Sequence, residues 1–135
     1  MLDAYLPVAS LLVVAWLFGG MLLFSAGFAA FLFKYLPPVQ ARMLIRKAFP
    51  PFYLFVIFSS GLASVLSWRS DSFSAALMAF VMLTTVAARQ GLMPAINRAT
   101  DLGQKKRFLW LHGFSVFLSL GHIVLAAVAM VHMLG

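Results

Sequence analysis

The sequence contains no cysteine, and only three of its 135 residues are acidic. The absence of cysteine excludes disulfide bonds, thiolate metal sites and thiol redox chemistry. The acidic residues, Asp3, Asp71 and Asp101, are scattered, so the chain offers no carboxylate pair for general acid–base hydrolysis. A glycine-rich phosphate loop and a heptad repeat are also missing. Nothing in the composition therefore supports nucleophilic hydrolysis.

Charge is absent from four long stretches of the chain, residues 4–33, 48–68, 72–88 and 108–135. An α-helix needs about 20 apolar residues to cross the hydrocarbon core of a bilayer. We therefore expect four transmembrane spans at about residues 5–33, 48–68, 72–88 and 108–135. A hydrophobic fraction of 64% and a mean hydropathy of +1.01 leave too few polar residues for a water-facing surface. The predicted fold is all-α, a single integral membrane four-helix bundle over residues 1–135.

The few charges that are present are mostly basic, and they gather in two of the three predicted connections. The first connection carries Lys34, Arg42, Arg46 and Lys47, and the third carries Arg89, Arg98, Lys105, Lys106 and Arg107 with Asp101. Each has a net charge of +4, whereas Arg69 and Asp71 cancel in the second. The positive-inside rule then predicts that the first and third connections face the cytoplasm and that both termini lie on the outer side. The net charge of +7 is explained by topology, so no nucleic-acid partner is expected.

The predicted connections have some local character of their own. Residues 39–49 are amphipathic and are expected to lie on the membrane surface, with Pro50 and Pro51 opening the second span. Gly91 and Pro94 are expected to interrupt the chain before the third connection at residues 92–107. Within the spans, small residues four apart, such as Ser60 and Ser64, are typical of close contacts between membrane helices.

A first candidate site lies in the third connection and the start of the fourth span. Asn97, Arg98 and Asp101 share one face of a helical turn that Pro94 can begin. Because arginine binds phosphate and carboxylate groups, this face predicts a site for an anionic headgroup or small anion. Its candidate residues are Arg42, Arg46, Arg89, Asn97, Arg98, His112 and Ser115. The alternative is that these residues only set the topology and tie the connections to the helix ends.

A second candidate site rests on His122, which falls near the centre of the fourth span. Met78 and Met82 flank the centre of the third span on one helical face. Imidazole and thioether ligands suit Cu(I), and a His/Met pair suits haem. The alternative is a histidine hydrogen-bonded to Thr84, Thr85 or a backbone carbonyl, with the methionines as packing residues. No cofactor is predicted on balance, and haem or copper remains the alternative.

Several short motifs resemble those of the transmembrane protein 205-like family. They are Trp16-Leu17-Phe18-Gly19-Gly20 with Phe24, Ala48-Phe49-Pro50-Pro51-Phe52-Tyr53, Pro94 with Asn97-Arg98, and Leu111-His112-Gly113 with Ser115. The resemblance runs from about Trp16 to Leu120 and implies a small four-span membrane protein of unassigned activity. The Trp-x-x-Gly-Gly opening is also similar to copper-resistance membrane proteins and to haem-binding protoporphyrinogen oxidases. Those oxidases carry a first-span histidine that this chain lacks.

These observations favour a small polytopic membrane protein without an evident catalytic site. We expect a bundle module or accessory subunit of a larger membrane assembly. Its expected partners are membrane lipids, including anionic headgroups, and other membrane subunits or further copies of itself. The alternatives are a haem- or copper-binding protein that uses His122 and a small-solute transporter. Transport has less support, because the spans lack the internal charges that usually mark a transport path.

The distribution of charge over the connections predicts how single cysteines will react in intact cells. Cysteine at Gln40 or Gln104 should be protected from a membrane-impermeant thiol reagent, because both connections face the cytoplasm. Cysteine at Ser70 should be labelled. The native chain contributes no background, since it has no cysteine. Labelling at Gln40 or Gln104 without permeabilisation would contradict this topology.

Overall fold

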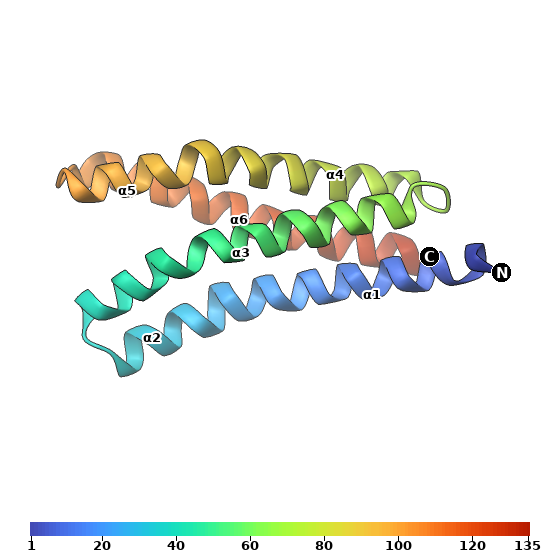
Figure 1. Cartoon of the computed structure of the whole chain (residues 1–135), viewed down its shortest axis with the longest axis horizontal. Helices are drawn as coiled ribbons and strands as arrows, with labels where there is room; N and C mark the ends of the chain where they lie inside the picture. Colours follow the sequence, from blue (N-terminus) through green and yellow to red (C-terminus); the bar gives the residue numbers. More distant parts are fainter.

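The apolar stretches form long helices that run back and forth along one axis (Figure 1). A computed structural model describes all residues, 1–135. The first span consists of α1 (Leu2–Leu22), a π-helical segment η1 (Leu23–Phe28) and α2 (Ala29–Tyr35). The second is α3 (Pro38–Ser67), and the third is α4 (Ser72–Ala87), a π-helical segment η2 (Ala88–Leu92) and α5 (Met93–Asp101). The fourth is α6 (Lys105–Leu134), and the structure contains no strand.

Four continuous helical segments are long and apolar enough to cross a membrane. They cover residues 2–35, 38–67, 72–101 and 105–134. Large apolar side chains, including Leu12, Phe58 and Phe117, are exposed along these helices, as expected for a surface that faces lipid. The prediction of an all-α protein with four membrane-spanning helices in one bundle is therefore confirmed.

The helices extend beyond the predicted spans, and two local predictions are wrong. Residues 39–49 do not form a separate surface segment, because they are the beginning of α3, which continues through Pro50 and Pro51. Residues 92–101 likewise continue the third span, through η2 and α5. Gly91 and Pro94 do not interrupt the helix. Charge limits how far a helix is embedded in lipid, whereas the helix itself can continue into water.

Each span packs against its neighbours in the sequence, and the last span closes the ring. The α3 helix contacts α1 and α4, and α6 contacts α4 and α1. This order is an up-down-up-down four-helix bundle with short connections. Both termini lie at one end of the bundle, and the hairpin of α2 and α3 separates from α5 and α6 toward the other end (Figure 1). Nine apolar residues form the core: Val14, Leu17, Met21, Val56, Ala63, Met78, Val81, Ala126 and Ala129.

Serine hydroxyls connect neighbouring helices through backbone carbonyls. Ser10 donates to the Ala63 carbonyl at 3.3 Å, from α1 to α3. Ser64 donates to the Ala75 carbonyl at 2.8 Å, from α3 to α4. Such bonds are important in lipid, where burial of apolar surface does not drive helices together. Of the serine pair expected at a helix contact, Ser64 makes this interhelical bond, whereas Ser60 donates to Val56 within its own helix.

The turns between spans follow from local chemistry. Pro38 stands at the start of α3, where its missing N–H costs no helical hydrogen bond. Asp71 caps α4 by accepting a 3.0 Å hydrogen bond from the Ser74 amide. Gly103 ends the third span with a φ of +66°, a conformation that other residues adopt at a cost. These three turns are short, so the helices position nearly every side chain discussed below, and Asp71 in the second turn is the exception.

The adjacent Gly19 and Gly20 predict different responses to substitution. A Cβ at Gly20 would lie 2.5 Å from Phe55 Cζ on α3, whereas a Cβ at Gly19 would meet no atom within 4 Å. Gly20→Leu should therefore separate α1 from α3 and lower the melting temperature of the purified protein. Gly19→Leu should leave the melting temperature unchanged. Equal destabilisation by both variants would show that the α1–α3 contact is misassigned.

Candidate functional site

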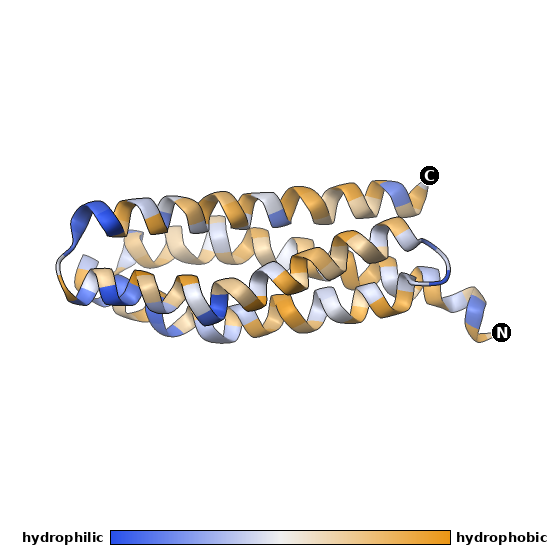
Figure 2. Cartoon of the chain, turned by 90° about the horizontal axis from the view of Figure 1, so that it is seen from above, coloured by the Kyte–Doolittle hydropathy of each residue, from blue (hydrophilic) through white to orange (hydrophobic).

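Hydrophilic residues gather at the end of the bundle opposite the termini (Figure 2). This basic end is formed by α2, the first turns of α3, η2 with α5, and the first turn of α6. It carries all the lysines and every arginine except Arg69. Asp101 is its only acidic residue. The structure thus brings the predicted first and third connections to one end, as an up-down-up-down bundle does.

One ion pair joins the two hairpins at the basic end. Arg46 of α3 contacts Asp101 of α5 through two bonds, Nη1 to Oδ1 at 2.7 Å and Nη2 to Oδ2 at 3.0 Å. The bidentate geometry is the favoured one for guanidinium and carboxylate. Both side chains are exposed, so water weakens the attraction. The sequence placed Asp101 on a face with Asn97 and Arg98, but the structure gives it a partner on another helix.

The other residues of the predicted anion site are spread over four elements, α3, η2, α5 and α6. Arg42 and Arg98 lie on α3 and α5, where Arg42 is exposed and Asn97 is half-buried beside Arg98. His112 is exposed on α6 and stacks on Phe108 with ring centroids 5.3 Å apart.

Two further members of the set differ from these in their surroundings. Ser115 is buried and donates to the His112 carbonyl within its own helix at 2.9 Å. Arg89 lies in η2 with its Nε buried and without a hydrogen-bond partner. The side chains of this set therefore form no hydrogen bonds with one another, and Arg89 alone among them has a buried donor without a partner.

A small polar cavity lies between the four spans, near their middle. Its volume is about 10 Å³. It is lined by Met21, Ser25, Phe52, Tyr53, Val56, Thr85, Ser119 and His122, which come from all four spans. Polar side chains are costly at this depth of a bilayer and are usually functional or paired. The sequence singled out His122 and expected Thr85 near it, but it gave no signal that Tyr53, Ser25 and Ser119 would line the same cavity.

His122 is buried and forms one side-chain hydrogen bond, between its Nε2 and Thr84 Oγ1 at 2.7 Å. Thr84 is among the partners expected from the sequence. Met78 is fully buried but does not line the cavity. Met82 also lies outside it and packs its sulfur toward Gly61. A cavity of about 10 Å³ has no room for a porphyrin, so these residues do not fit haem.

An apolar groove of about 980 Å³ runs along the outside of the first span, against α3. Small residues form its floor, and Trp16, which is 70% exposed, stands at its edge. The groove is lined by Ala15, Trp16, Gly19, Gly20, Leu23, Phe24, Gly27, Phe28, Phe31, Ala48, Phe52 and Phe55. Phe24 and Phe52 stack face to face at its inner wall, with centroids 3.9 Å apart. Ala15, Gly19, Leu23 and Gly27 follow one another at intervals of four residues, and Leu23 is the one large side chain in this series.

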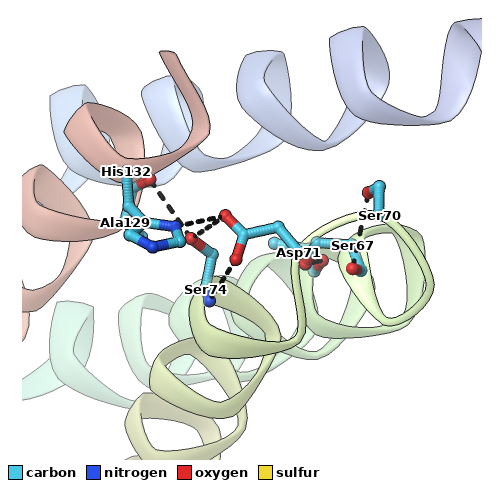
Figure 3. A network of polar contacts seen from close by, with 7 residues as sticks. Ser67, Ser70, Asp71, Ser74, Ala129 and His132 are labelled. Carbon is cyan, nitrogen blue, oxygen red and sulfur yellow. Dashed lines mark hydrogen bonds and ion pairs between the residues drawn. The ribbon is translucent and has the colours of Figure 1, made fainter. Parts of the chain in front are cut away.

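A polar network at the opposite end was not anticipated from the sequence (Figure 3). Asp71 Oδ2 accepts from Ser74 Oγ at 2.5 Å and from His132 Nδ1 at 2.8 Å. Ser74 Oγ also lies 3.3 Å from the Ala129 carbonyl of α6. The cap of α4 is thereby joined to the last turn of α6. Burial alone would raise the pKa of Asp71, but the hydrogen bonds from Ser74 and His132 outweigh it and lower the pKa.

Comparison with protein families gives one match, the family described as "Domain of unknown function (DUF4149)", over residues 12–105. The chain belongs to this family. The DUF4149 match contains every residue of the groove, whereas Ser119 and His122 of the cavity lie beyond it. No curated protein and no solved structure matches the chain. The expected membership of an uncharacterised family is confirmed, and the resemblance to the transmembrane protein 205-like family stays a prediction.

The Arg46–Asp101 pair can be tested by a double-mutant cycle. Arg46→Ala and Asp101→Ala should each cause a small loss of thermal stability, because either change removes the same bidentate contact. The double variant should lose no more than a single one. Arg98→Ala serves as the matched control, since Arg98 has no acidic partner. Additive losses for the two substitutions would show that they do not interact.

The Asp71 network predicts a dependence of stability on pH. Since the pKa of Asp71 is lower in the folded protein than the usual value of about 3.9, its carboxylate stabilises the fold above that value. This contribution is lost as the pH falls through the folded-state pKa. Asp71→Asn should therefore lower the melting temperature at pH 7 and should differ less from the wild type near pH 3. A difference that stays constant over this range would refute the role of the charge.

Proposed function

We propose that this DUF4149 protein is a non-catalytic helix-bundle module of a larger membrane assembly. A transmembrane helix of another subunit would bind in the groove beside α1. The groove is the main support, since about 980 Å³ of apolar space lies beside α1, and Ala15, Gly19, Gly20 and Gly27 line it together with aromatic side chains. The three carboxylates are scattered along the sequence, and no group of three or more histidine or carboxylate side chains is placed to hold a metal ion.

The shape of the groove favours a helix as its occupant. In lipid, helices associate where small residues let their backbones approach closely and gain van der Waals contact. Gly19 supplies such a place, because a Cβ there would meet nothing within 4 Å. Gly20, by contrast, is already used for the contact with Phe55 of α3. Gly20 thus serves a contact within the bundle, whereas Gly19 is available for contact with a partner.

The proposal includes an orientation. The basic end would face the cytoplasm of a bacterial inner membrane, with both termini outside, as the positive-inside rule requires. All the basic residues there apart from Arg46 are without acidic partners, so anionic lipid headgroups are the natural counter-ions.

The other two functions considered from the sequence have less support. Met78 and Met82 do not line the cavity that His122 lines, so the proposed ligand set does not come together there. A solute transporter needs a path through the bundle, and the cavity between the spans is only about 10 Å³. We therefore propose neither cofactor binding nor solute transport.

Site-directed photo-crosslinking in native membranes tests the occupant of the groove. A photoreactive residue at Gly19 should yield one discrete adduct with another polypeptide, either a different subunit or a second copy. The matched control is the same residue at Gly121 of α6, which also faces open space but lies outside the groove. Lipid adducts alone at both positions would mean that acyl chains fill the groove, and the proposal would fail.

Substitution of the same glycine gives an independent test. Gly19→Leu should abolish the complex seen by native electrophoresis in mild detergent, because the side chain would occupy the position of the partner backbone. Gly121→Leu should leave the complex intact. Persistence of the complex in the Gly19 variant would exclude the groove as the interface.

A further inference from the structure

The cavity between the spans contains more hydrogen-bonding groups than its own residues can satisfy. Tyr53 and His122 are each 6% exposed. The hydroxyls of Tyr53 and Ser119 form no hydrogen bond to another protein group, and neither oxygen is fully enclosed by protein. His122 uses only Nε2, in its contact with Thr84. Since lipid offers no hydrogen bonds at this depth, groups left in this condition carry a large desolvation cost.

The contact with Thr84 fixes which nitrogen of His122 remains available. A threonine hydroxyl has one hydrogen, and Thr84 Oγ1 lies 2.8 Å from the Phe80 carbonyl one turn earlier. Helical threonines commonly donate to that carbonyl. Thr84 then accepts from His122 Nε2–H, and the neutral ring keeps a lone pair on Nδ1. This second nitrogen has no partner in the protein and requires a donor.

We propose that the cavity is a binding site for one water molecule. This water donates a hydrogen bond to His122 Nδ1 and accepts from the hydroxyls of Tyr53 and Ser119. The volume of about 10 Å³ corresponds to a single water, and a buried water typically makes about three hydrogen bonds. The proposal is separate from the groove, because it concerns the interior of the bundle and not its partner.

The donor set distinguishes water from a metal ion. Cu(I) prefers soft thioether and imidazole ligands. The cavity presents one thioether, on Met21, and one free imidazole nitrogen, and its remaining polar groups are hydroxyls. Hydroxyl groups suit a ligand that both donates and accepts hydrogen bonds. The water would also connect the spans, because Tyr53 belongs to α3 and the other two partners to α6.

Solid-state NMR of the ¹⁵N- and ¹³C-labelled protein in lipid bilayers, with magnetisation transferred from water, tests the site directly. The Nδ1 signal of His122 should receive magnetisation from water and should have the shift of an unprotonated, hydrogen-bonded nitrogen. The exposed His112 provides the positive control, and Ala126 in the apolar core provides the dry control. A His122 signal as dry as that of Ala126, with His112 hydrated, would overturn the proposal.

Variants identify the partners of the water. Tyr53→Phe keeps the ring and removes only the hydroxyl, so the transfer to His122 should weaken, whereas Tyr5→Phe at the exposed N-terminal end should have no effect. Ser119→Leu should fill the cavity and abolish the transfer of magnetisation from water to His122. If that variant does not fold, the result for Tyr53→Phe tests the proposed water site alone. An unchanged signal in Tyr53→Phe would exclude the assigned geometry. Changes in the chemical shifts of both Met21 and His122 on addition of one equivalent of Cu(I) would show that the cavity binds a metal ion and not water.

Discussion

The absence of water in the hydrocarbon core governs most of this structure. Helices in lipid gain nothing from burying apolar surface against each other, so they need close backbone contact and polar bonds between spans. The bundle supplies both. Gly20 lets α1 approach Phe55, and Ser64 and Ser74 reach carbonyls on neighbouring helices. The same constraint draws attention to the cavity and the groove. The cavity places polar groups between the spans, and the groove leaves one side of α1 without close helix contact, and neither adds to the stability of the bundle.

These features also divide the molecule by depth. The basic end carries the charges and the Arg46–Asp101 pair, and the middle contains His122 with its hydroxyl neighbours. The far end is closed by the Asp71 network. The cavity and the groove are not fully separate, because Phe52 lines both. A change at Phe52 would therefore alter the interior of the bundle and its outer surface together.

The fold was largely predictable from the sequence, because a run of about 20 apolar residues without charge is long enough to cross a bilayer and too apolar for a surface in water. The helices nevertheless continue beyond the charge-free stretches, as residues 39–49 and 92–101 show. The sites were harder to predict. Asp101 and Arg46 are 55 positions apart, and Asp71 and His132 are 61 apart. Such contacts depend on the rotation of each helix about its own axis, which a periodic apolar pattern leaves open when every face is apolar.

The two prolines inside α3 limit how deeply this helix can be inserted in the bilayer. Pro50 and Pro51 have no amide hydrogen, so the carbonyls of Arg46 and Lys47 lose the donors that an α-helix normally supplies. Those two oxygens need water or headgroups, and the hydrocarbon core provides neither. From Pro50 to the end of α3 at Ser67 is about 27 Å, close to the thickness of that core. The double proline therefore favours a boundary of the hydrocarbon core near Pro50. The first turns of α3 would then lie among headgroups or in water, outside the acyl chains.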